Sequence, residues 1–446
     1  RYKAPAGVVS GEVLESLKSR KKELIEHLRK RDDRNIFCGT IERVEEREYY
    51  PVSAAQKRMF LLDRMERQST AYNLTQVLKI EGRPDRERIA GAIGRLIKRH
   101  EALRTSFDMI DGQPMQKIHT NVEFKLEYES LSGGEEMLEA AIAGTVRPFE
   151  LSRAPLLRFK LIELCGDEPI FFLVQDMHHI ISDGVSEGVL VREFNTLYAG
   201  GSLPELKIRY RDYVGWQSRL LSSEAMEAQR KFWKERLGGE MPVLNLPADY
   251  KRPQVFDYRG GTVALRIDRQ LAGRLKAMAR ESRVTLYSVL LAAYNVLLWM
   301  YTGQDDIVIG TPTAGRRHAD VHNIIGVFIN TLALRSRVMP EKTFAEFLRE
   351  VGGNVLEAFD NQDYPFEQLV EELAVRRDFG RNPVFDAMFI LLNMEVGDIK
   401  AEGLKVSRYA YSRKMAQFDL TLIATEQGDG IDIDISYWTG LFERGT

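Results

Sequence analysis

The sequence predicts an α/β protein of about three domains, or of two large lobes with an appendage. From Tyr49 onward, segments with apolar residues at helical spacing alternate with short apolar runs, as an α/β fold requires. The 446 residues correspond to about three domains' worth of chain at ~150 residues per domain. With 44% hydrophobic and 9% aromatic residues, the chain can bury a sizeable core, which excludes wholesale disorder.

Composition excludes several classes of partner. The chain carries 63 Lys and Arg against 65 Asp and Glu, so no overall basic field exists to hold nucleic acid or an anionic membrane. Cys38 and Cys165 have neither CxxC nor zinc spacing, which excludes a disulfide framework and fits a reducing compartment. The most apolar stretch, 289–301, is shorter than the ~20 residues of a membrane span, and the first residues lack the apolar core of a signal peptide. We therefore expect a soluble, cytoplasmic protein.

The first 48 residues differ from the rest of the chain. Apolar residues recur near helical spacing after Ser10, a suitable N-cap, which predicts an amphipathic helix over 11–31. The opposite face is rich in Lys and Arg, but glutamates interleave with them, which favours a solvated helix face over a nucleic-acid site. Residues 33–48 are polar and charged, as a linker would be.

Each further element follows from its residue pattern. Apolar runs bounded by turn residues predict strands at 76–80, 124–128, 156–164, 170–175, 261–267, 305–310, 330–335, 387–392, 418–426 and 430–437. Apolar residues three and four apart predict helices at 54–67, 85–99, 135–147, 186–198, 210–221, 223–236, 270–282, 286–301, 344–361 and 365–373. The helix at 286–301 is apolar on all sides, follows Thr285 and precedes Gly303, so we expect it to be buried.

Two adjacent histidines, His178 and His179, form the main candidate site. They follow an apolar run, and the turn pair Asp183-Gly184 separates them from an amphipathic helix. Because neighbouring side chains on a strand point to opposite sides, one ring should face packed structure and the other a cleft. Each member also has a structural interpretation, since a buried histidine is more often a core residue than a catalyst and Asp-Gly is an ordinary turn.

Other site chemistries find little support in the sequence. Adjacent histidines on a strand cannot both ligate one ion, and no further His, Cys or Asp cluster has ligand spacing, so we expect no metal. Neither a GxSxG elbow nor a reactive cysteine context occurs. The glycine-containing string at 310–316 lacks the Lys-Ser/Thr ending of a phosphate-binding loop.

The string His178-His179-x-x-x-Asp183-Gly184 resembles the signature of the chloramphenicol acetyltransferase-like acyltransferases, and its surroundings are similar to condensation domains of nonribosomal peptide synthetases. Six further blocks are similar to that family in order, with Gly215 and Gly380 as small departures. These blocks lie at 53–59, 99–107, 210–216, 325–331, 361–367 and 377–383. Residues 1–32 resemble part of a tubulysin-synthetase-type N-terminal docking domain.

The resemblance implies both a fold and an activity. The fold is two chloramphenicol acetyltransferase-like lobes in a V-shaped pseudo-dimer with a central tunnel, here 49–221 and 222–446. The activity is peptide-bond formation between a donor acyl or peptidyl thioester and the α-amine of an acceptor aminoacyl thioester. Both substrates arrive on phosphopantetheine arms of upstream and downstream peptidyl carrier proteins, and the domain itself binds no cofactor. The docking-like segment adds an upstream synthetase subunit as a candidate partner.

The resemblance also assigns roles to residues of this chain. His179 is the catalytic residue that faces the tunnel, and His178 orients the turn. Asp183 is expected to form a salt bridge with Arg316, and Gly184 to let the pantetheine arm pass close to the backbone. Ser186 and Asn330 are expected to line the tunnel, with core packing an equal alternative for Asn330.

Three alternatives within this fold remain open. A coenzyme A-dependent acyltransferase disagrees with the six other blocks. An epimerisation domain usually carries a tryptophan soon after the glycine of the motif. A catalytically inactive recruitment domain typically loses the second histidine or that glycine, and both His179 and Gly184 are present here. The strings at 53–59 and 182–186 favour the subtype that joins two L-residues.

Overall fold

The structure of the chain is a computed structural model that describes residues 40–65, 69–373, 378–392, 399, 403–411 and 414–446. The docking-like segment at 1–32 with its predicted helix, and residues 33–39 of the predicted linker, lie outside the described residues. Within the described ranges, helices pack on mixed sheets, so the predicted α/β class is confirmed.

The first lobe is built on a five-stranded sheet whose central strand is β7. In sheet order its strands are β12 (Lys405–Arg408), β2 (Asn73–Glu81), β7 (Ile170–His178), β6 (Leu157–Leu164) and β5 (Glu127–Leu131). Helices α4 (Arg86–Arg99) and α6 (Gly184–Tyr198) cover one face, and α5 (Glu135–Thr145) covers the other. Because helices cover both faces, β7 is apolar along most of its length instead of alternating in polarity.

A second, smaller sheet closes the lower end of this lobe. It has the strand order β1 (Tyr50–Pro51), β4 (Gln113–Ile118) and β3 (Thr105–Ile110). The helices α3 (Ala54–Met65) and α7 (Tyr210–Leu221) lie near it, toward the other lobe.

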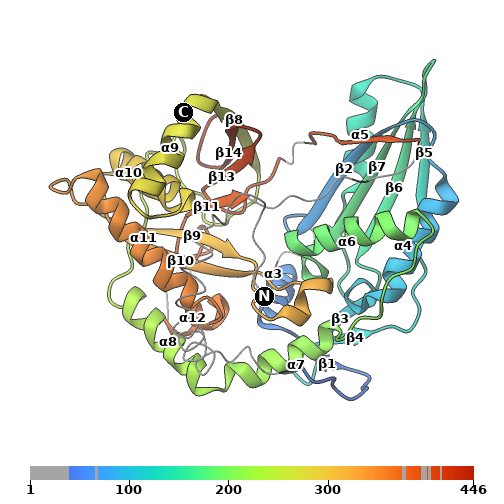
Figure 1. The fold of residues 1–446 in the computed structure, drawn as a ribbon, viewed down its shortest axis with the longest axis horizontal. Helices are drawn as coiled ribbons and strands as arrows, with labels where there is room; N and C mark the ends of the chain where they lie inside the picture. Colours follow the sequence, from blue (N-terminus) through green and yellow to red (C-terminus); the bar gives the residue numbers. More distant parts are fainter. Residues whose placement is uncertain (1–39, 66–68, 374–377, 393–398, 400–402, 412–413) are drawn as a thin grey trace, which may run out of the picture.

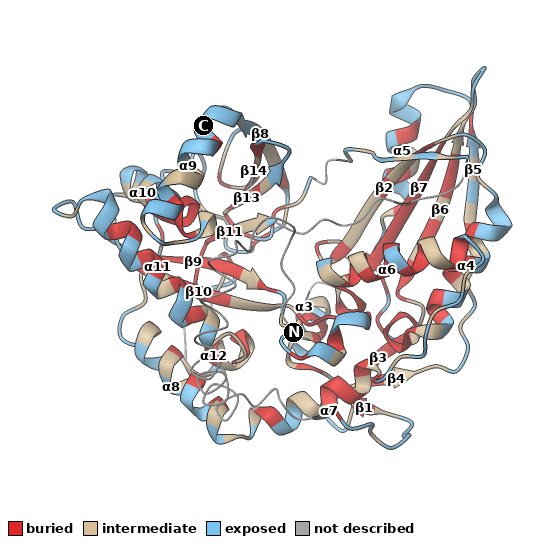
Figure 2. Cartoon of the chain, viewed as in Figure 1, coloured by how far each residue is buried: buried red, intermediate tan, exposed pale blue. Residues whose placement is uncertain are grey.

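The second lobe holds a six-stranded sheet. In sheet order its strands are β10 (Asn330–Arg337), β9 (Asp306–Thr313), β11 (Ala387–Leu392), β13 (Leu420–Gln427), β14 (Gly430–Trp438) and β8 (Gly260–Ile267). Its helices are α8 (Glu224–Leu237), α9 (Arg269–Glu281), α10 (Leu286–Thr302), α11 (Phe344–Asp360) and α12 (Phe366–Glu372). Buried residues, red in Figure 2, follow the strands and the inner helix faces in both lobes.

Two segments from the second half of the chain pack on the first lobe. Residues 321–328 supply apolar side chains to the core of the first lobe, and β12 pairs antiparallel with the edge strand β2. Figure 1 shows the lobes side by side, with β12 (red) reaching across to the first sheet. The two main hydrophobic cores divide near the predicted boundary at 221 and 222, although Leu220 already packs in the second core and these two segments cross to the first lobe. The domain bounds stay a prediction. The pseudo-dimer and the central tunnel stay predictions.

Two expectations about elements were wrong. The strand predicted at 124–128 begins later, as β5, and strands β1, β3, β4 and β12 were not predicted. Helix α10 is not buried on all sides, because Leu297 is 40%, Met300 70% and Tyr301 62% exposed in its C-terminal half. Among the described helices none alone is long and apolar enough for a membrane span, and the one pair that suffices, α9 with α10, bends by 105°.

Candidate active site

The histidine pair lies where β7 ends and the chain turns into α6. His178 is the last residue of β7, and a short 3-10 turn, η3 (His179–Ile181), follows it. Asp183 then caps the N-terminus of α6, because its carboxylate accepts a hydrogen bond from the Ser186 amide at 2.7 Å. The buried central strand β7 therefore places both histidines at a tight turn, which is followed by the Asp183 cap of α6.

The two rings have different environments, as strand geometry predicts. His178 is 3% exposed, its Nδ1 accepts a hydrogen bond from the Ile180 amide at 3.1 Å, and its ring packs edge-on against Phe149. Burial, and secondarily the neighbouring His179, lower the pKa of His178 to about 3. His178 is therefore neutral near pH 7 and holds the turn.

His179 is the partly exposed residue of a run, Phe171 to Asp183, that is otherwise buried. Its amide donates to the Tyr72 carbonyl at 2.7 Å, which fixes the backbone. Its Nδ1 lies 2.7 Å from the carbonyl oxygen of Ser182. A carbonyl can only accept, so Nδ1 carries the hydrogen and Nε2 carries the lone pair of the neutral ring. The turn therefore presents His179 as a hydrogen-bond acceptor and base.

Asp183 points away from His179 and binds a different set of groups. Its Oδ1 accepts from the Arg316 guanidinium at 3.2 Å in addition to the Ser186 amide, and its Oδ2 accepts from the Phe328 amide at 2.9 Å. Both partners of the ion pair are buried. The expected Asp183–Arg316 pair is present, and Asp183 does not act as the orienting carboxylate of a triad.

Arg316 bridges the turn to the segment that crosses from the second lobe. Its guanidinium donates to the carbonyls of Val321 and Ile324 at 2.5 and 2.9 Å, and stacks 3.9 Å over the Phe328 ring. The preceding residue, Gly315, has φ +61 and a Cβ there would meet the Phe328 carbonyl oxygen at 1.9 Å, so only glycine fits. These contacts fix the position of the buried Arg316 guanidinium.

Two residues expected to line a tunnel have other surroundings. Ser186 is fully buried: its hydroxyl donates to the Gly326 carbonyl at 2.7 Å and accepts from Arg316 at 2.6 Å, so the expectation for Ser186 was wrong. The amide of Asn330 donates to the carbonyls of Gln362 and Tyr364, both at 2.8 Å. Asn330 thus pins the loop before α12 and also lies in the lining of a small cavity between α7 and that loop.

Residues 46–446 match the family model described as Condensation domain. This chain belongs to the condensation domain family. A second model, described as TubC N-terminal docking domain, matches residues 1–30, outside the described residues. Both resemblances that the sequence indicated are confirmed.

The relatives of this condensation domain include much longer proteins. Tyrocidine synthase 3 of Brevibacillus parabrevis is 47% identical over 406 residues, which are 91% of this chain and 6% of that protein. Gramicidin S synthase 2 of Aneurinibacillus migulanus is 47% identical over 407 residues, 91% of this chain and 9% of that protein. The chain thus spans less than a tenth of either relative.

Solved structures share the fold of this condensation domain. The X-domain from teicoplanin biosynthesis superposes with a TM-score of 0.83 at 28% identity, covering 91% of this chain and 93% of that one. The first condensation domain of the calcium-dependent antibiotic synthetase has a TM-score of 0.72 at 19% identity, which shows the fold alone.

Sequence reasoning missed several residues that hold the turn of this condensation domain. Tyr210 donates to the Val327 carbonyl at 2.6 Å and to Ser53 at 3.0 Å, and a Cβ on Gly326 would collide with the Tyr210 ring. Glu187, one turn into α6, is buried beside Gln175, whose amide donates to it at 2.8 Å. The blocks at 53–59, 210–216 and 325–331 contain the first set, but their order along the chain does not show which atoms meet.

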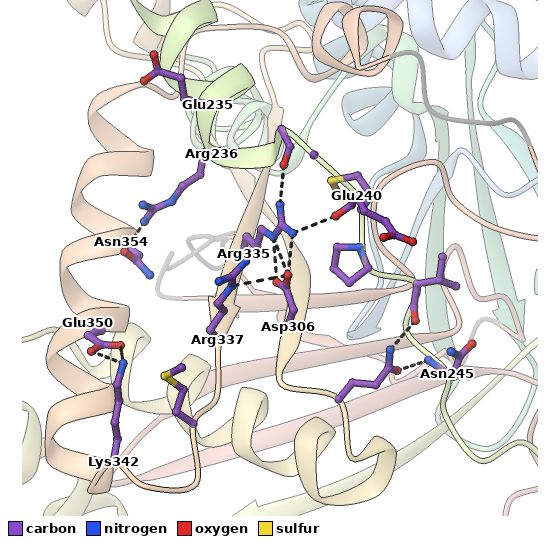
Figure 3. A pocket seen from close by; sticks show the side chains of 17 residues that line it. Glu235, Arg236, Glu240, Asn245, Asp306, Arg335, Arg337, Lys342, Glu350 and Asn354 are labelled. Atoms are coloured by element: carbon purple, nitrogen blue, oxygen red, sulfur yellow. Dashed lines mark hydrogen bonds and ion pairs between the residues drawn. The ribbon is translucent and has the colours of Figure 1, made fainter.

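A large cavity lies elsewhere. It is an open groove of about 960 Å³ between α8, α11 and the β9–β10 edge, and Figure 3 shows the side chains that line it. Its charged groups mostly pair with one another: Arg335 binds Asp306 at 2.7 Å, and Lys342 binds Glu350 at 2.7 Å. Size alone therefore does not mark the reactive site, and the cavities described here do not have His179 in their lining.

Proposed function

We propose that this condensation domain forms peptide bonds between two carrier-bound thioesters. The donor is an acyl or peptidyl thioester and the acceptor is the α-amine of an aminoacyl thioester, each on the phosphopantetheine arm of a peptidyl carrier protein. The observation that carries the proposal is the partly exposed His179, whose Nε2 holds the ring's lone pair while its neighbours are buried. Membership of the condensation domain family supports the same reaction class.

The reaction exchanges a thioester for an amide. The acceptor nitrogen attacks the donor carbonyl carbon, a C–N bond forms and the C–S bond breaks. The thiolate leaves on the donor arm, and the lengthened peptide stays on the acceptor arm. The attacking nitrogen becomes cationic in the tetrahedral intermediate, so one of its protons must leave.

His179 serves this reaction mainly by positioning the amine. A free α-amine has a pKa of about 7.7–8.0, and the adjacent thioester lowers it further, so much of the nucleophile is neutral near pH 7.5. Orientation supplies up to ~7–11 kcal/mol, whereas a general base supplies only ~10²–10⁴-fold. Nε2 accepts a hydrogen bond from the amine first and removes its proton second.

Gly184 is proposed to leave room for the phosphopantetheine arm of a carrier protein. It is exposed at the start of α6, and apart from its chain neighbours and the backbone of α6 no atom lies within 4 Å of a Cβ built there. Glycine is therefore not required by the fold at this position. Its side-chain-free surface, three residues from the reactive turn, suits close approach of a phosphopantetheine chain.

The remaining parts of the proposal concern context. The strings at 53–59 and 182–186 favour an L-donor and an L-acceptor. The match of residues 1–30 to a docking model supports an upstream synthetase subunit as a partner, in addition to the upstream and downstream carrier proteins. We place the reaction in the cytoplasm, with no cofactor or metal held by the domain.

A second candidate is a catalytically inactive recruitment domain of the same fold. The similarity to the X-domain from teicoplanin biosynthesis favours it, at 28% identity over 91% of this chain. The intact His179 and Gly184, and the 47% identity to peptide synthases, favour the catalytic function.

One assay separates these functions. The chain is mixed with a donor carrier loaded with an L-aminoacyl thioester and an acceptor carrier loaded with a second one, and the acceptor arm is analysed by mass spectrometry. A dipeptide on the acceptor arm supports the proposal. Binding of both carriers without a dipeptide supports the recruitment domain, and product formed only from a coenzyme A thioester supports the coenzyme A-dependent acyltransferase.

A further inference from the structure

Residues 324–328 lie beside the histidine turn. Each of them makes at least one hydrogen bond to a residue outside the segment. The Ile324 carbonyl accepts from Arg316, and the Gly326 amide and carbonyl both bind the Ser186 hydroxyl. The Val327 carbonyl accepts from Tyr210, and the Phe328 amide donates to Asp183. Asp183 caps α6 and Ser186 lies in the first turn of that helix, so these bonds join residues 324–328 to the end of the histidine turn.

The amide of the remaining residue, Ile325, binds a histidine that takes no part in the chemical steps proposed above. It donates to Nδ1 of His100 at 3.3 Å, across 225 positions of sequence. His100 ends α4, is 2% exposed, and is fixed by its own amide, which donates to the Leu96 carbonyl at 2.9 Å.

The protonation state of His100 follows from its partners. An amide N–H can only donate, so Nδ1 is the acceptor and Nε2 carries the hydrogen. Nε2 lies 2.8 Å from Oε2 of Glu193 on α6, and the same oxygen accepts from Arg99 at 3.0 Å. Burial lowers the pKa of His100, which agrees with a neutral ring that donates to Glu193 and accepts from Ile325.

We propose that His100 is a positioning residue of the condensation reaction. It anchors residues 324–328 to α4 and α6, and through their backbone it holds Asp183 and Ser186, and so the turn that carries His179. The bond that matters is the one from Ile325 to Nδ1. The bond to Glu193 fixes the tautomer and the ring orientation that make Nδ1 an acceptor. The catalytic consequence rests on the proposed function, whereas the ordering of residues 324–328 does not.

Two variants separate the two bonds of the ring. In His100→Asn, Oδ1 lies where Nδ1 lay, so the acceptor for Ile325 is kept and the donor to Glu193 is lost. In His100→Gln, the longer side chain places its amide near Nε2, so the donor to Glu193 is kept and the acceptor for Ile325 is lost. Each variant loses one buried hydrogen bond, and His100→Asn loses the stronger one, to the Glu193 carboxylate. A larger effect of His100→Gln on the Ile325 amide therefore cannot result from a greater loss of stability.

Amide hydrogen exchange resolved to single residues and steady-state condensation of carrier-bound thioesters test the proposal. We expect His100→Gln to speed exchange of the Ile325 amide about fivefold to tenfold and to lower kcat about 10- to 100-fold, with KM unchanged. His100→Asn should stay within about threefold of wild type in both readouts. Equal behaviour of the two variants overturns the proposal.

Amide exchange also tests the proposal when the variants do not fold or when the wild type forms no dipeptide. If neither variant folds, the wild-type chain decides: the Ile325 amide should exchange as slowly as amides of β7, and rapid exchange overturns the proposal. If no dipeptide forms with the wild type, the proposed function fails, and the exchange contrast still tests the anchoring of residues 324–328.

Discussion

At the residue scale, the two neighbouring histidines of the turn have different roles. His178 is buried and neutral, and it binds the Ile180 amide, whereas His179 is partly exposed and directs its lone-pair nitrogen away from the Ser182 carbonyl. The alternation of side chains on a strand could be read from the sequence and predicted this division. Which ring faces which side came from the family resemblance, because the residues alone do not give the direction of the strand's faces.

The Asp183–Arg316 pair is the residue-scale feature with the largest expected effect on stability. Replacing Arg316 by Met leaves the buried Asp183 carboxylate without its cation, which should lower the free energy of unfolding by about 3–5 kcal/mol. Denaturant titration of the isolated variant measures the loss.

An exposed ion pair provides the matched control for this variant. Arg266 binds Asp432 on the surface of the second sheet, so Arg266→Met should cost no more than about 1 kcal/mol. Equal losses for Arg316→Met and Arg266→Met would show that burial of the Asp183 pair does not matter.

At the element scale, α6 offers a comparison within one helix. Apart from chain neighbours and the backbone of α6, no atom lies within 4 Å of a Cβ built on Gly184 or on Gly188. Alanine therefore fits at both positions, and each change should raise helix stability by up to about 1 kcal/mol. The added methyl at position 184 enters the proposed path of the phosphopantetheine arm. We expect Gly184→Ala to lower kcat/KM about tenfold or more, and Gly188→Ala to leave it unchanged.

Thermal unfolding and condensation rates of the two glycine variants check this expectation together. A stable Gly184→Ala variant with the wild-type rate would place the arm elsewhere. A variant that loses rate and stability together would instead mean that the glycine serves the fold.

The elements that the sequence predicted are those with strong local patterns. The apolar run at 170–175 and the helix at 210–221 became β7 and α7 because their burial is periodic or continuous. Strand β4 was missed because Pro114 argues against a strand, and β12 because four residues carry no pattern. Its partner β2 lies more than 300 positions away, and no local signal encodes that pairing.

The candidate active site was likewise predicted only where its residues are neighbours in sequence. The turn itself was predicted from adjacent residues, but the hydroxyl of Ser186 was expected to face a tunnel and instead binds Gly326 and Arg316. The contact between His100 and Ile325 joins positions 225 apart. Such contacts depend on how the second half crosses to the first lobe, which the order of motifs does not reveal.

At the scale of the whole molecule, the crossing segments should make the lobes unfold together. A buried carboxyl provides a probe in the first lobe, since burial raises the pKa of Glu187 from 4.5 to about 7, against the opposing effects of Gln175 and Arg408. Between these values the folded state binds more protons than the unfolded state. The stabilisation from the neutral carboxyl is therefore full below pH 4.5 and is lost as the pH rises through 7.

Glu187→Gln keeps this side chain neutral at every pH. Relative to wild type, the variant should be more stable at pH 8 than at pH 5 by about 1–3 kcal/mol, whereas Glu168→Gln on the exposed β6–β7 turn should show no such difference. Three of the four tryptophans, Trp233, Trp299 and Trp438, lie in the second lobe, and the fourth, Trp216, packs against both hydrophobic cores, so their fluorescence reports mainly on the second lobe. If the lobes are coupled, fluorescence shows the same shift as circular dichroism; a shift in circular dichroism alone would mean independent lobes.

The most direct test of the central claim replaces His179 and follows single-turnover dipeptide formation between two loaded carrier proteins from pH 6 to 9. If Nε2 positions the amine and then removes its proton, His179→Ala should lower the rate about 10²–10⁴-fold, and His179→Gln, which can accept a hydrogen bond but not a proton, should recover part of that loss. The control variant His119→Gln changes a partly buried histidine beside Ser106, outside the histidine turn, and should keep the wild-type rate. Dipeptide formation by His179→Ala at the wild-type rate across this pH range would contradict the assignment of His179 as the catalytic residue.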